Sequence, residues 1–163
     1  MLATSKTKKP VIRQSKIIHK SPILHPLTRF VTEEAVVVMF NISVEQIERI
    51  ECCCHIVYVH GTGVSRFVSY ADFPPPIGVA PPNAPDFVRW RKRWRKRFNS
   101  RYAPDLWQRF YIYQFQQALD VNELIEWWQV VALVKPVLSV EALQQITLFY
   151  HQEKTAWVNM VKR

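Results

Sequence analysis

Residues 31–70 read VTEEAVVVMFNISVEQIERIECCCHIVYVHGTGVSRFVSY, and this stretch decides the fold. It opens with Thr32, a good N-cap residue, and with two glutamates that suit the positive end of a helix dipole. The three valines at 36–38 are β-branched and favour a strand by propensity, which leaves a strand as the alternative. Because the cap and the first turn both favour a helix, the sequence predicts a helix over residues 31–40.

A second helix is predicted directly after the first. Asn41 tolerates the left-handed conformation that often ends a helix. Ser43 and Gln46 have the spacing of a capping box. Apolar side chains then recur at helical spacing, at Val44, Ile47 and Ile50. These signals predict a helix, a short turn and a second helix over residues 43–51.

A β-hairpin is predicted to follow the second helix. Residues 55–60 and 66–70 resemble two strands, because β-branched and aromatic side chains recur in alternation. Between them, Gly61-Thr62-Gly63 supplies the conformational freedom that a tight turn requires. The order of helix, turn, helix and two-stranded ribbon is that of a winged helix-turn-helix.

The same stretch resembles the small winged-helix domains of the MerR and excisionase type. The resemblance is carried by Glu34-Ala35, by the turn Asn41-Ile42-Ser43, by Arg49 and by Asp72-Phe73. It covers residues 31–76 and implies a winged helix-turn-helix that binds duplex DNA. It also implies DNA contacts from Ser43, Gln46 and Arg49 in the second helix and from Arg66 in the wing. A second resemblance, over residues 47–73, is to the opening strands of LytTR-type β domains.

The positive charge of the chain is concentrated in two segments. The net charge is +9, from 22 Lys and Arg against 13 Asp and Glu. Residues 1–30 carry seven basic and no acidic side chains, whereas residues 31–85 carry two basic and six acidic ones, a net charge of −4. The second basic segment, residues 86–101, has a net charge of +7, with one acid against Arg89, Arg91, Lys92, Arg93, Arg95, Lys96, Arg97 and Arg101. Such segments indicate either contact with a polyanion or a solvated surface.

The second half of the chain is predicted to be helical. A proline-rich linker over residues 77–85 precedes Asp86, the expected N-cap of a helix. In that helix, basic residues surround a narrow aromatic stripe formed by Phe87, Trp90, Trp94 and Phe98. Three further helices are predicted over residues 105–119, 123–134 and 139–160, which is enough for a small bundle.

Several classes of function are excluded by composition and motifs. Only 3 Gly are present, and the glycine-rich phosphate loops of nucleotide enzymes are missing. The 3 Cys are adjacent, at 52–54, and adjacent side chains diverge, so we expect no metal site and no disulfide framework. No catalytic constellation is visible, and we expect no cofactor and no enzymatic activity. We expect a cytoplasmic protein without a transmembrane segment, because no apolar run is long enough to span a bilayer.

The sequence therefore predicts a mainly α protein with a small β-hairpin, in four segments. These are a flexible basic arm (1–30), a winged helix-turn-helix-like domain (31–76), a proline-rich linker (77–85) and a helical domain that opens with the basic amphipathic helix (86–163). We expect a regulatory or recombination/replication accessory protein that binds nucleic acid, specifically duplex DNA, mainly through phosphate contacts. The aromatic-rich helical domain would mediate homodimerisation or bind a protein partner. The alternative is a non-enzymatic interaction scaffold whose basic segments bind an acidic partner or a membrane surface.

Overall fold

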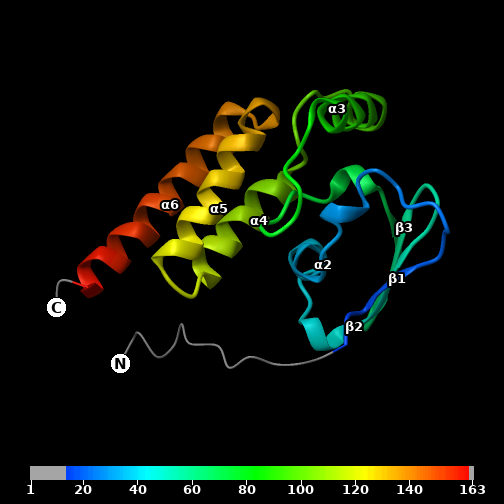
Figure 1. Ribbon diagram of the computed structural model, residues 1–163, viewed down its shortest axis with the longest axis horizontal. Coiled ribbons are helices and arrows are strands. Elements are labelled where there is room, and N and C mark those ends of the chain that lie inside the picture. The colour runs from blue at the N-terminus through cyan, green and yellow to red at the C-terminus, as the bar shows by residue number, and fades with distance from the viewer. Residues whose placement is uncertain (1–13, 162–163) are drawn as a thin grey trace.

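The computed structural model describes residues 14–161, which form a mainly helical chain with a four-stranded sheet on one side (Figure 1). The strands, in their spatial order, are β1 (Ile17–His19), β2 (Ile47–Cys52), β3 (Val57–Gly61) and β4 (Val64–Val68). The α-helices are α2 (Glu33–Phe40), α3 (Ala84–Phe98), α4 (Asp105–Gln117), α5 (Val121–Val134) and α6 (Val140–Val161). No helix within residues 14–161 has the length and apolar character that a membrane span needs.

The helix predicted over residues 31–40 is confirmed as α2. The side-chain oxygen of Thr32 accepts a hydrogen bond from the backbone N–H of Ala35 at 3.1 Å. Asn41 ends the helix in the left-handed conformation, with a φ of 53°. The strand preference of the three valines does not prevail, because Val36 is buried on the core face of α2 and packing outweighs intrinsic propensity.

The helix predicted over residues 43–51 is wrong. Only a 3₁₀ turn (Val44–Gln46) forms, and the chain then extends into β2. A β-bulge between Ile47 and Arg49 shifts the register of this strand, so that Ile47 and Ile50 are both buried although they are three residues apart. The bulge therefore reproduces the spacing that, in the sequence, predicted a helix.

The predicted hairpin is confirmed as β3 and β4, within two residues of the expected bounds. The two strands pair antiparallel and are joined by Thr62-Gly63, where Gly63 has a φ of 71°. Glycine adopts this left-handed φ without strain, which suits it to the second position of the turn. Val57 and Val59 face the core, and Tyr58 lies on the opposite face of the sheet.

The flexible arm predicted over residues 1–30 is wrong for its second half, and residues 1–13 lie outside the described residues. β1 pairs parallel to β2, and Leu27 and Phe30 are buried in the core. The backbone N–H of Lys16 also donates to Oε2 of Glu33 at 2.9 Å. Strand pairing and apolar burial therefore order this basic segment.

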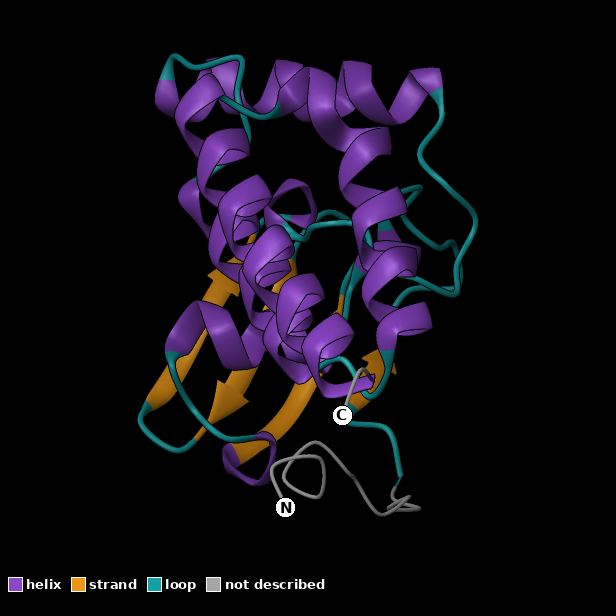
Figure 2. Cartoon of the chain, turned by 90° about the vertical axis from the view of Figure 1, so that its left-hand side faces the viewer, coloured by secondary structure: helices purple, strands orange, loops and turns teal. Residues whose placement is uncertain are grey.

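Helices are present at all four positions predicted in the second half of the chain, as α3 to α6. The N-cap of α3 is Asn83 and not Asp86, because Asp86 occupies the third helical position and forms a capping box with Asn83. α2 lies between the sheet and α4, and the helices lie on one side of the sheet (Figures 1 and 2). Residues on both sides of the proline-rich segment thus belong to one buried cluster.

Candidate nucleic-acid interface

The position of α3 is set by tryptophan side chains that donate hydrogen bonds to backbone carbonyl oxygens of the segment after β4. Nε1 of Trp94 donates to the carbonyl oxygen of Ala71 at 3.1 Å, and Nε1 of Trp107, on α4, donates to that of Asp72 at 3.1 Å. The predicted aromatic stripe is therefore a core stripe at Trp90 and Trp94, which are fully buried. Phe98, at its end, is 48% exposed. These bonds fix α3 beside residues 69–72 and leave the remaining surface of the helix to its basic side chains.

A buried carboxylate joins the start of α3 to the N-terminal segment. The Asp86 side chain is 1% exposed and forms an ion pair with the guanidinium of Arg29. Arg29 also donates to the carbonyl oxygens of Ala80 and Pro81, at 3.1 Å each. A second guanidinium, that of Arg89, lies 3.6 Å from the same carboxylate. Residues 25–30 are therefore held against α3.

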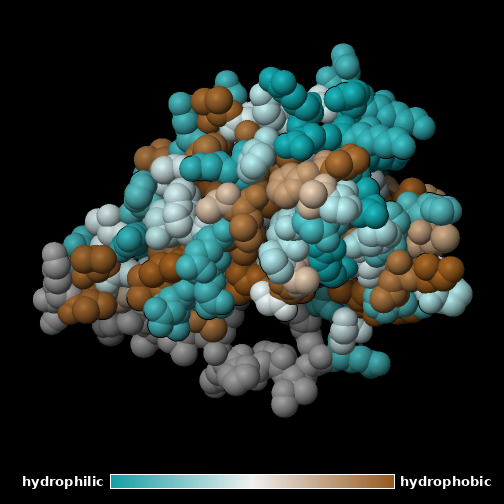
Figure 3. Space-filling model, turned by 45° about the horizontal axis from the view of Figure 1, so that its top comes forward, coloured by the Kyte–Doolittle hydropathy of each residue, from teal (hydrophilic) through white to brown (hydrophobic). Residues whose placement is uncertain are grey.

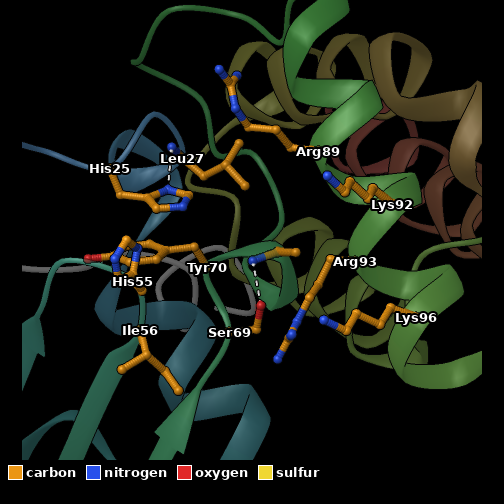
Figure 4. Close-up of a pocket in the computed structure, with 11 residues that line it drawn as sticks. His25, Leu27, His55, Ile56, Ser69, Tyr70, Arg89, Lys92, Arg93 and Lys96 are labelled. Carbon is orange, nitrogen blue, oxygen red and sulfur yellow. Dashed lines mark hydrogen bonds between the residues drawn. The ribbon is translucent and has the colours of Figure 1, made fainter.

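A cleft of about 590 Å³ lies between α3 and this N-terminal segment (Figure 4). Four cationic side chains of α3 line one wall: Arg89, Lys92, Arg93 and Lys96. They are spaced i, i+3, i+4 and i+7, so they form one stripe on the helix. The opposite wall includes His25, His55, Ile56, Ser69 and Tyr70. The cleft thus has one strongly basic wall and one wall of aromatic, apolar and small polar groups.

The charged side chains that line the cleft are all positive, and one of them, Arg89, also lies beside the buried carboxylate of Asp86. The first and last of the four cations, Arg89 and Lys96, are seven positions apart, or about 10 Å along the helix at about 1.5 Å per residue. No Asp or Glu is among the described residues that line the cleft. Hydrophilic side chains gather over α3 on the surface (Figure 3). Like charges at these spacings repel one another, and a bound anion would relieve that repulsion.

The aromatic wall is built around a stacked pair of rings. The rings of His25 and Tyr70 are 4.1 Å apart and inclined by 7°. Nδ1 of His25 accepts from the backbone N–H of Leu27 at 3.0 Å, and Tyr70 donates its hydroxyl to the carbonyl oxygen of Cys53 at 2.5 Å. Burial, followed by the charges of Arg89 and His55, lowers the pKa of His25, and burial raises the pKa of Tyr70 to about 12. Both rings are therefore neutral near pH 7.

Sequence reasoning missed this aromatic wall. His25, His55 and Tyr70 come from three separate segments, and none has a neighbour at a spacing that indicates a site. The basic run of α3 was the only signal that pointed to the cleft.

The other basic residues predicted over 86–101 are not among the described residues that line the cleft. The guanidinium of Arg91 lies 5.6 Å from the ring centre of Phe87, and that of Arg97 forms an ion pair with Asp72 at 2.8 Å. Arg95 and Arg101 line a separate hollow at the C-terminal end of α3. The eight predicted cations of residues 86–101 therefore divide into a cleft group of four and four that lie elsewhere.

The four residues that the winged-helix resemblance selected lie on or beside the sheet, and none of them is among the described residues that line the cleft. The prediction that Ser43, Gln46 and Arg49 share a recognition helix is wrong, since Arg49 belongs to β2. Oε1 of Gln46 accepts from the backbone N–H of Ser43 at 2.9 Å, and Arg49 forms ion pairs with both Glu48 and Glu51. The guanidinium of Arg66, on β4, lies 6.0 Å from the ring centre of Phe40.

Among the described residues, no group of three or more His, Cys, Asp and Glu side chains could hold a metal ion. Cys52 is buried, Cys53 is half-buried and Cys54 is exposed. Comparison of the chain with protein-family models, curated proteins and solved structures finds no match. The geometry and charge of the cleft therefore provide the basis for a functional proposal.

Proposed function

We propose that this protein binds nucleic acid, with duplex DNA as the expected form, through phosphate contacts made by α3. The observation that carries the proposal is the stripe of Arg89, Lys92, Arg93 and Lys96 along one cleft. One strand of B-form DNA carries one phosphate for each 3.4 Å of axis, so the stripe of about 10 Å matches about three phosphates. The opposing wall adds no carboxylate that would repel them.

The DNA contacts would come from α3 and not from a recognition helix. The winged-helix resemblance contributes only α2 and the β3–β4 hairpin, because residues 47–52 form a strand with Glu48 and Glu51 beside Arg49. Carboxylates at that surface disfavour the binding of a polyanion such as DNA, because the like charges repel. Contacts from α3 to the phosphate backbone of DNA would be largely independent of the base sequence, which suits an accessory protein that binds many DNA sites.

Two matched variants test the proposal. Lys92→Gln with Lys96→Gln removes two charges, spaced i and i+4, from the cleft stripe. Arg91→Gln with Arg95→Gln removes two charges at the same spacing from positions outside the cleft. The two double variants have the same net charge and change the same helix, and they differ in the position of the lost charges and in replacing Lys or Arg.

The measurement is the dissociation constant for a random-sequence duplex as a function of salt concentration. Each phosphate contact contributes about 0.9 to the log–log salt slope, so the cleft variant should lower the slope by about 1.8. The same relation gives about a 30-fold weaker binding at about 0.15 M salt. The Arg91 and Arg95 variant should change the slope much less. Equal effects of both variants, or no binding by the parent protein, would overturn the proposal.

A further inference from the structure

Beyond backbone contact, we infer that the cleft between α3 and residues 25–27 holds one unpaired nucleotide of the bound strand, such as the terminal nucleotide of an overhang. This inference rests on the proposed function, because it assigns a ligand to the same cleft. The two proposals predict different requirements for binding. Contact with a duplex needs only the cations of α3, whereas binding of an unpaired nucleotide also needs the aromatic wall.

The two walls of the cleft match the two chemical parts of a nucleotide. Lys92 and Lys96 supply the cationic wall for the phosphate. The face of the His25 ring, stacked on Tyr70, and the half-buried side chain of Ile56 supply flat and apolar surface for a base. Aromatic side chains beside a basic groove are the usual means by which proteins bind unpaired bases. The cleft volume of about 590 Å³ lies in the range of small-ligand sites, about 300–1,000 Å³.

The polar groups of the aromatic wall are oriented by the fold. Because Nδ1 of His25 accepts the backbone N–H of Leu27, the neutral imidazole carries its proton on Nε2. Oγ of Ser69 accepts from the backbone N–H of Ala71 at 3.2 Å, so its own hydroxyl proton is available as a donor. Figure 4 shows His25 and Ser69 on the wall opposite the basic side chains of α3. Both donors suit the carbonyl oxygens and ring nitrogens of a base.

Burial, hydrogen bonds and an ion pair hold the aromatic wall in place, as in a preorganised binding site. The Tyr70 side chain is buried, and its hydroxyl bonds the carbonyl oxygen of Cys53. Arg29 and Asp86 hold the segment that carries His25 against the first turn of α3. A ring that is already fixed loses little conformational entropy when a base stacks on it.

The test compares three DNA ligands with the same duplex sequence. The first has blunt ends, the second has a short single-stranded overhang, and the third has the same overhang with abasic sites in place of its bases. The second and third ligands have equal numbers of phosphates, so a difference between them reports base contact alone. Binding is measured by fluorescence anisotropy at one salt concentration, with the full chain.

Three substitutions complete the test. His25→Asn removes the ring. It keeps an acceptor for the backbone N–H of Leu27, because an Asn side chain readily bonds the backbone two residues further along the chain. His25→Phe keeps an aromatic face. His19→Ala removes an exposed histidine outside the cleft and serves as the control.

The parent protein, His25→Phe and His19→Ala should bind the base-bearing overhang about 5- to 150-fold more tightly than the abasic one, the range that one stacked base is worth. His25→Asn should abolish this difference and leave blunt-duplex affinity unchanged. If the parent protein does not distinguish the two overhangs, or if His25→Asn retains the preference, the inference is wrong while duplex binding through α3 stands. If the parent protein binds none of the three ligands, the proposed function fails as well.

Discussion

Removal of the Asp86 carboxylate should destabilise the fold, because it breaks a buried ion pair with Arg29 and a capping hydrogen bond at the start of α3. Asp86→Ala removes the hydrogen bond from the backbone N–H of Asn83, a capping interaction worth about 0.5–2 kcal/mol. It also removes a charged hydrogen bond to Arg29, worth about 1.5–3 kcal/mol. The Arg29 side chain is 25% exposed and regains some hydration in the variant, so we take the lower part of the sum, about 2–4 kcal/mol.

The assay is thermal and urea unfolding of the full chain. For a chain of this length, each 1 kcal/mol lowers Tm by about 2–4 °C, so Asp86→Ala should lower Tm by about 5–15 °C. The matched control is Asp105→Ala, which breaks an exposed pair with Arg109 at the start of α4 and should cost less than about 1 kcal/mol. A double-mutant cycle with Arg29→Ala should give a coupling energy of about 1–3 kcal/mol between Arg29 and Asp86. The reasoning is refuted if Asp86→Ala costs no more than the control, or if the coupling energy is zero within error.

Two further predictions concern the sheet and the cysteines. Gly61→Ala should lower the free energy of unfolding in urea by about 1–3 kcal/mol, because the new Cβ would lie 2.5 Å from the backbone oxygen of Gln46. An unchanged urea midpoint would contradict this prediction. Iodoacetamide at mildly alkaline pH should alkylate exposed Cys54 well before buried Cys52. The reason is that the thiolate is the nucleophile and that burial raises the pKa of the Cys52 thiol to about 11. Peptide mass spectrometry that finds Cys52 modified first would contradict this prediction.

Elements with local signals were predictable from the sequence. Thr32 and Asn41 determined where α2 begins and ends, because a cap acts within one turn of the chain. The glycines on either side of Thr62 marked the turn between β3 and β4. The aromatic spacing in residues 87–94 defined the core face of α3, and the basic residues between them indicated the cationic wall of the cleft.

Elements that depend on distant partners were decided only by the tertiary structure. β2 forms because residues 47–52 have strand partners on both sides, β1 and β3, and its bulge disguises the strand period as a helical one. Residues 17–19 become a strand only because the edge of β2 offers unpaired backbone groups. The aromatic wall of the cleft arises in the same way: His25 stacks on Tyr70 across 45 positions of the sequence, and the ion pair between Arg29 and Asp86 holds that segment beside α3. The sequence by itself determined the helix caps, the hairpin turn and the basic face of α3, since each depends on residues within a few positions of one another. The second wall that turns this basic face into a cleft depends on contacts between segments that only the folded chain brings together.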